Sequence, residues 1–163
     1  MNWDAVGAGA ELVGALGMIA SLFYLGTQIR QNTKIVRTAS YHALVTNLAT
    51  LASDVGRDPK ATDVFARGQA DPSSLSDLEK KQFGLLLQNM MRNFENIFYQ
   101  ASEGMIDDVV WQGWESRILR YYWQPGVQEW WPTWRSDCHP EFRALLEGSD
   151  PPSGPVVPIY LGE

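Results

Sequence analysis

Residues Val6–Leu25, VGAGAELVGALGMIASLFYL, form the stretch on which the interpretation of the whole chain depends. These residues are apolar or small throughout, except for one carboxylate at Glu11. An α-helix rises about 1.5 Å per residue, so a helix of about 20 residues spans about 30 Å, the thickness of the hydrocarbon core of a bilayer. The stretch therefore predicts a transmembrane helix within residues 1–27.

The charges on either side of this stretch predict its orientation. Asp4 precedes it, and the first basic residue, Arg30, follows it. A secretory signal has the opposite polarity, with positive charge first and a small-residue cleavage site last. The positive-inside rule places the basic side in the cytoplasm and the N-terminus outside. A helix buried in the core of a soluble bundle is the alternative, because Glu11 and the glycines lower the mean hydropathy of the stretch.

Small residues gather on one face of the predicted helix, at intervals of three and four. Such a face lets helix backbones approach closely, so it predicts a helix–helix interface. Glu11 lies beside this face and is a candidate pore or partner contact, because carboxylates at this depth face a partner, a cavity or water. Alternatively, Glu11 has no chemical role, because its side chain extends to the outer membrane interface or is protonated. The predicted interface residues are Gly7, Ala10, Gly14, Gly17 and Ser21.

Composition excludes several classes of function. The 163 residues carry a net charge of -6 and contain no block of Lys and Arg, so nucleic acid is not an expected partner. A single cysteine, Cys138, excludes an internal disulfide and a cysteine-rich metal site. His42 and His139 are far apart and lack the spacing of a metal motif. We therefore expect neither a metal nor a cofactor.

Beyond the apolar stretch, the sequence predicts a small helical bundle. Ser76 and Glu79 have the spacing of a capping box and predict the start of a long helix. Apolar residues recur with the helical period in most of the predicted segments. The fold class is thus all-α, with the transmembrane helix continuing into a cytoplasmic bundle at residues 28–148 and a Pro-rich extended tail at 149–163. The expected helices cover residues 28–56, 59–67, 77–102, 109–123 and 140–147, and a short segment at 127–134 lies between the last two.

Aromatic side chains are concentrated in the last third of the chain. They suit three roles: the lid of the bundle core, a patch on the bilayer headgroups, or a stacking site for a ligand such as a cation. Nothing in the pattern selects a substrate. Glu95 is the most notable carboxylate here, and we expect a structural ion pair with Arg92, Arg117 or Arg120. The candidate aromatic patch comprises Trp111, Trp114, Trp130, Trp131 and Trp134.

Short motifs along the chain resemble a family of small uncharacterised bacterial proteins. The resemblance begins with Asn2–Ala5 and Tyr24–Thr33, which includes the stretch Gln-Ile-Arg-Gln-Asn-Thr. It extends to about Leu146 and implies a bacterial, N-terminally anchored helical protein, without implying an activity. The other matching motifs are Glu95–Gln100, Gly104–Asp107, Trp111–Trp114 and Pro140–Arg143.

The sequence as a whole predicts a non-enzymatic single-pass protein of the bacterial inner membrane. We expect it to act as an oligomeric scaffold or as an accessory subunit of a membrane complex, in contact with lipid and with itself or a partner membrane subunit. One alternative is a homo-oligomeric channel-like assembly lined by the small-residue face and Glu11. Another is a soluble helical bundle that binds a ligand or acts as an enzyme.

Overall fold

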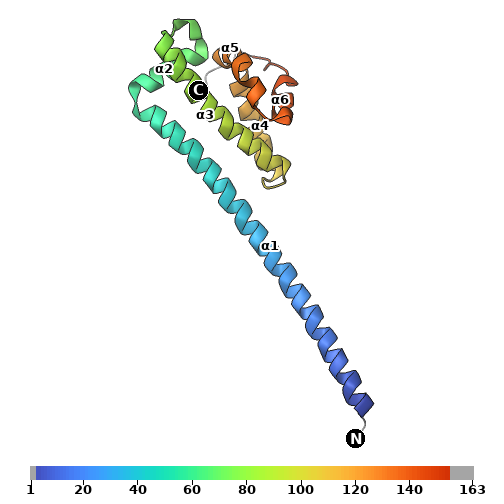
Figure 1. Cartoon of the computed structure of the whole chain (residues 1–163). Coiled ribbons are helices and arrows are strands. Elements are labelled where there is room, and N and C mark those ends of the chain that lie inside the picture. Colours follow the sequence, from blue (N-terminus) through green and yellow to red (C-terminus); the bar gives the residue numbers. More distant parts are fainter. Residues whose placement is uncertain (1–2, 155–163) are drawn as a thin grey trace. The chain divides into compact units, whose positions relative to one another are not determined.

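In the computed structural model, the backbone is described for residues 3–154, and side chains are described for Gly14 and residues 16–154. All regular elements in this range are helices, as the sequence predicts (Figure 1). The chain divides into two compact units, unit 1 at Met1–Ser40 and unit 2 at Tyr41–Glu163. This division falls later than the boundary expected after residue 27. The elements are α1 (Trp3–Arg57), α2 (Pro59–Ala70), η1 (Pro72–Ser74), α3 (Asp77–Ser102), α4 (Asp108–Tyr122), α5 (Pro125–Trp134), η2 (Arg135–Asp137) and α6 (Pro140–Glu147).

Helix α1 joins the apolar stretch and the segment that follows it into one continuous helix of 55 residues. It ends at Arg57, and Asp58 then caps α2 by accepting a hydrogen bond from the backbone N–H of Lys60 at 2.9 Å. Within the described residues, no helix is both long enough and apolar enough to cross a bilayer. The first half of the stretch, residues 6–13, falls outside the described side chains.

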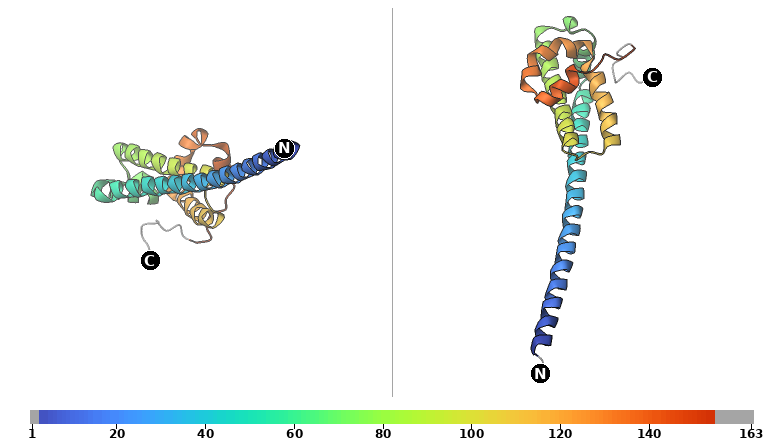
Figure 2. Two further views of the ribbon diagram at one scale, coloured as in Figure 1. Left: turned by 90° about the horizontal axis from the view of Figure 1, so that it is seen from below. Right: turned by 90° about the vertical axis from the view of Figure 1, so that its right-hand side faces the viewer.

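Helix α3 is the centre of unit 2 and contacts α2, α4, α5 and α6 (Figure 2). Its start is fixed by the capping box that the sequence predicts. The backbone N–H of Glu79 donates to Ser76 Oγ, and Glu79 Oε2 accepts from the backbone N–H of Ser76 at 2.8 Å. Two backbone donors at the helix start are thereby satisfied. Helix α3 contributes six buried side chains to the core: Phe83, Leu87, Met90, Met91, Phe94 and Ile97.

Helices α4 and α6, and the last part of α1, close the core around α3. Ile118, Phe142 and Leu146 are completely buried, and Leu44 is the one fully buried side chain among the described residues of α1. Leu48 and Leu51 pack against the same core at the helical spacing set by Leu44. Unit 2 thus has a closed core of its own.

Helices α2 and α5 contact each other through glycine. A Cβ atom added to Gly126 would collide with the backbone carbonyl oxygen of Gly68, and one added to Gly68 would lie 2.6 Å from the ring of Phe83. Only residues without a side chain permit two backbones to approach this closely. The pair Gly68 and Gly126 therefore sets the distance between α2 and α5.

Arg67, near the end of α2, links that helix to the start of α3. Its guanidinium forms ion pairs with Asp63 at 2.8 Å and with Glu79 at 2.6 Å, and donates to the carbonyl oxygen of Ser74 at 2.9 Å. The backbone N–H of Ser76, its hydroxyl group and Arg67 together lower the pKa of Glu79 to about 2. Glu79 is therefore ionised wherever this junction is intact.

Candidate functional site

The described surface of α1 in unit 1 is the first candidate site, because all of its large apolar side chains are exposed. Exposure reaches 74% at Phe23 and 68% at Met18, and it does not fall below 51% at the others. Successive helical residues are rotated by about 100°, so these side chains do not share one face. Monomeric soluble proteins rarely expose a continuous apolar surface of this kind. The residues concerned are Leu16, Met18, Ile19, Leu22, Phe23, Tyr24 and Leu25 of the apolar stretch, followed by Ile29, Ile35 and Val36.

The small-residue face has no partner within the described part of the chain. A Cβ atom added to Gly14 or Gly17 would meet no atom within 4 Å, and Ser21 is exposed. Packing within the chain therefore gives no reason for glycine at these positions, although glycine lowers helix stability in water. The remaining residues of the predicted interface, Gly7 and Ala10, lie outside the described side chains, as does Glu11.

The hydroxyl groups of α1 bond to the helix's own backbone. Ser21 Oγ donates to the carbonyl oxygen of Gly17 at 2.9 Å, and Thr33 Oγ1 donates to that of Ile29 at 2.9 Å. Gln28 Nε2 donates to the hydroxyl oxygen of Tyr24 at 3.0 Å. A serine or threonine hydroxyl group bonded in this way needs no water partner for its donor.

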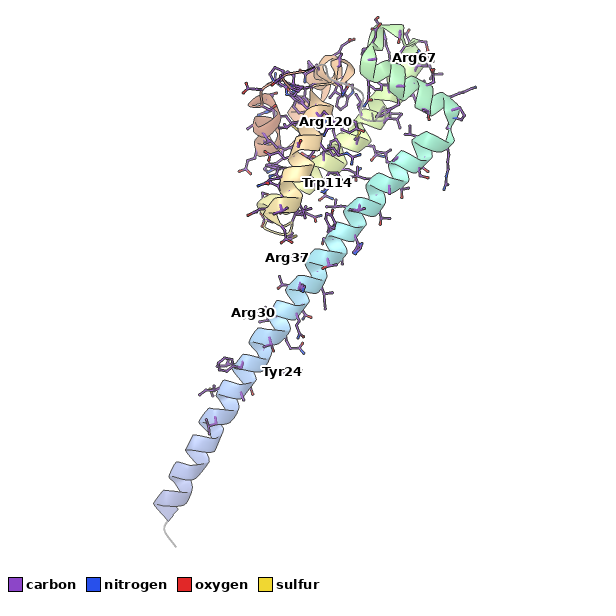
Figure 3. The ribbon with its side chains drawn as sticks, turned by 180° about the vertical axis from the view of Figure 1, so that it is seen from behind. Tyr24, Arg30, Arg37, Arg67, Trp114 and Arg120 are labelled. Carbon is purple, nitrogen blue, oxygen red and sulfur yellow. The ribbon has the colours of Figure 1, made fainter. Side chains whose placement is uncertain are left out.

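Beyond Leu25, the part of α1 in unit 1 carries three exposed basic residues, Arg30, Lys34 and Arg37, of which Figure 3 labels the two arginines. Their spacing of four and three residues places them on one face of the helix. Basic side chains thus join the exposed apolar ones on α1 after Leu25.

The aromatic residues form the second candidate site, and the structure divides them. Trp131 and Trp134 are buried, at 5% and 3% exposure, as the core alternative predicts. Trp131 Nε1 donates to Glu147 at 3.0 Å, which satisfies its buried N–H group. Trp111 and Trp114 are half-buried on α4, where Trp111 packs against Phe98 with ring centroids 5.9 Å apart. The five tryptophans therefore do not form one exposed patch.

Trp130 and Trp134 both border a groove between α3 and α5. Trp130 is the more exposed of the two. Its ring stacks on Trp134 with centroids 5.7 Å apart, and its Nε1 would lie 3.3 Å from a Cβ atom added to Gly84. The groove is shallow, with a volume of about 460 Å³. Such an open shape encloses little of a small ligand, so it provides a weak site. Its lining residues are Lys81, Gly84, Leu85, Gln88, Trp130, Thr133, Trp134 and Asp137.

Arginines cover two of the tryptophans. The guanidinium carbon of Arg92 lies 5.4 Å from the ring centroid of Trp134, and that of Arg117 lies 5.7 Å from the ring centroid of Trp114 (Figure 3 labels Trp114). Both distances are typical of cation–π contacts. One face of each of these two rings is therefore occupied by one of the protein's own cations.

Glu95 has the structural role that the sequence predicts. It forms an ion pair with Arg92 at 3.1 Å, and its other oxygen accepts a hydrogen bond from the backbone N–H of His139 at 2.5 Å. Arg117, a second predicted partner, lies over Trp114 instead. Glu95 thus holds the start of α6 against α3.

The remaining candidate groups are Cys138 and the two histidines, His42 and His139. Cys138 is buried, and burial raises the pKa of its thiol, which keeps it protonated and unreactive at neutral pH. His139 caps α6 by accepting a hydrogen bond from the backbone N–H of Glu141, and His42 is exposed on α1. Where the structure describes side chains, no three His, Cys, Asp or Glu residues are grouped to hold a metal ion.

Comparison of the chain with protein-family models, with curated proteins and with solved structures finds no match.

Proposed function

We propose that the chain is a non-enzymatic, single-pass membrane protein that works as an oligomeric scaffold or as an accessory subunit of a membrane complex. Residues 6–25 anchor it in lipid of the bacterial inner membrane, with the N-terminus outside and unit 2 in the cytoplasm. The observation that carries this proposal is the exposure of every described large apolar side chain from Leu16 to Leu25.

The energetic argument is the cost of leaving these side chains in water. Burying one Leu, Ile, Phe or Met side chain contributes about 1.5–3 kcal/mol, and this contribution is forfeited at each of these positions in water. Lipid or a partner helix recovers it, because either removes apolar surface from water. Unit 2 has a separate core, closed around α3, to which none of these side chains belongs.

The small-residue face supports self-association or contact with a partner helix within the membrane. Helices in lipid associate by close packing, for which small side chains are the usual contacts. Gly14 and Gly17 have open space where a Cβ atom would lie, so a second helix can approach the backbone there. Gly26 has the same open space but lies on a different side of the helix, which makes it a matched control.

The test has two stages, beginning with fractionation of the full-length protein and measurement of its native mass in detergent. We expect extraction only by detergent, as a defined oligomer. Replacing Gly14 and Gly17 by Leu should abolish crosslinking in the membrane, whereas Gly26→Leu should leave it unchanged. A protein that stays soluble and monomeric without detergent contradicts the anchor, and unchanged crosslinking of the double variant contradicts the interface.

A further inference from the structure

The basic face of α1 carries positive charge that no neighbouring carboxylate balances. Asp and Glu are absent from the sequence between Glu11 and Asp54, although the whole chain holds 19 acidic residues. The three cations of this face, Arg30, Lys34 and Arg37, are exposed, and none belongs to an ion pair of the described residues. By contrast, Arg67, Arg92 and Arg135 in unit 2 all pair with carboxylates.

We infer that this face binds the phosphate groups of anionic phospholipids, an inference that rests on the proposed membrane anchor. Two observations identify phospholipid as the ligand: the charge of this face and its position along α1. Guanidinium and ammonium groups bind phosphate through charge-assisted hydrogen bonds. The basic face also begins directly after the apolar residues that end at Leu25, which is where an anchored helix meets the headgroups of the cytoplasmic leaflet.

The distance of each basic residue from Leu25 along α1 determines how strongly that residue should bind the lipid headgroups. At about 1.5 Å per residue, Arg30 lies about 8 Å beyond Leu25 and Arg37 about 18 Å beyond it. The headgroup layer is roughly 5–8 Å thick, and charge is screened over about 8 Å at physiological salt. Arg30 therefore contacts the headgroups directly, whereas Arg37 acts across the adjoining water. The loss of anionic lipid should be largest for Arg30→Gln and smallest for Arg37→Gln.

The experiment uses the full-length protein in lipid nanodiscs of phosphatidylcholine containing a minority of phosphatidylglycerol. Native mass spectrometry then counts the lipids of each kind that the released protein retains. We expect the wild type to retain phosphatidylglycerol in excess, and the triple variant R30Q/K34Q/R37Q to lose that excess. One basic residue near an anionic surface changes the local binding of such lipid by about fivefold, and salt reduces the effect. Raising the salt to 0.5 M should therefore lower the excess retained by the wild type.

The control variant is K60Q/K80Q/K81Q, which removes the same charge from exposed positions of unit 2. It should retain phosphatidylglycerol like the wild type. If the wild type and the triple variant are both embedded in the bilayer and retain equal amounts of phosphatidylglycerol, the inference is overturned. Failure of the anchor is seen separately: the protein would then not incorporate into nanodiscs of pure phosphatidylcholine.

Discussion

Phe23 and Phe94 are the same residue type on two helices of one chain, yet 74% of Phe23 is exposed and only 2% of Phe94. Phe94 is covered by side chains of unit 2, including the ring of Tyr121 at a centroid distance of 5.4 Å. No described side chain covers Phe23 to a comparable degree. Phe94 thus belongs to the closed core of unit 2, whereas Phe23 belongs to the exposed surface of α1 in unit 1.

Glycine shows the same difference between the two units. Gly68 and Gly126 occupy positions where any side chain would collide with backbone or with an aromatic ring. Gly14 and Gly17 occupy positions where a side chain would meet nothing. The first pair is explained by packing within the chain. The second pair has no such contact among the described residues, and the proposed helix–helix interface would explain it.

The largest expected effect is on the core of unit 2. Phe94→Ala should lower the free energy of unfolding by about 3–5 kcal/mol, because it removes a buried ring and leaves a cavity. Phe23→Ala should change it by no more than about 0.5 kcal/mol. Denaturant unfolding in detergent, followed by tryptophan fluorescence, measures both, since six of the seven tryptophans lie in unit 2. An equal loss in the two variants would show that Phe23 is buried and would remove the contrast between the units.

A smaller effect is expected at the contact between α2 and α5. Gly126→Ala should destabilise unit 2 by about 2–3 kcal/mol, because the added methyl group forces the two backbones apart. Gly113→Ala is the matched control: Gly113 is an exposed residue of α4 with no atom within 4 Å of an added Cβ atom. It should stabilise the protein by about 0.5–1 kcal/mol, since alanine favours the helix. A tolerated Gly126→Ala would contradict the close approach at Gly68.

The smallest expected effect is a dependence of stability on pH. It should be seen in unit 2, where the carboxylate of Glu79 is ion-paired. Because the pKa of Glu79 is lowered to about 2, its ionised form stabilises unit 2 above its ordinary pKa near 4.5. This contribution is lost as the pH falls from about 4.5 to about 2. The difference in unfolding free energy between the wild type and Glu79→Gln should shrink over that range. Helicity of residues 12–40, which lie in unit 1, should not respond in the same way, because that segment contains no carboxylate.

The opposite result is a difference in unfolding free energy between the wild type and Glu79→Gln that stays constant as the pH falls from about 4.5 to about 2. That result would show that the ion pair with Arg67 and the hydrogen bonds from Ser76 do not stabilise the folded state. Circular dichroism of the full-length protein in detergent, recorded at each pH, follows the helicity that remains.

Local signals predicted most of the helices. The capping box at Ser76 and Glu79 and the break at Gly104 gave the bounds of α3, because caps and breakers act over a few residues. Helix α2 extends past the predicted end at Arg67, to Ala70, because the glycine at position 68 packs inside the helix instead of ending it. Propensity alone does not reveal such a tertiary contact.

Sequence patterns did not predict the contacts between residues that are far apart in the sequence. Glu95 was expected to pair with one of three arginines, but its hydrogen bond from His139 depends on how α6 lies on α3. Likewise, the five tryptophans share a region of sequence, and only packing decides that Trp131 and Trp134 are buried. The exposed surface of α1, by contrast, follows directly from a run of apolar residues longer than a small core can cover.

The burial of Cys138 has a practical consequence for chemical labelling. Thiol reagents attack the thiolate, and a buried thiol with a raised pKa offers little of it while unit 2 is folded. A cysteine introduced at an exposed position such as Ser21 or Thr38 would then be the one that a maleimide or a bifunctional crosslinker modifies. Each position along α1 can therefore be probed singly for its surroundings in an otherwise native sequence, and loss of that selectivity would itself report that unit 2 has unfolded.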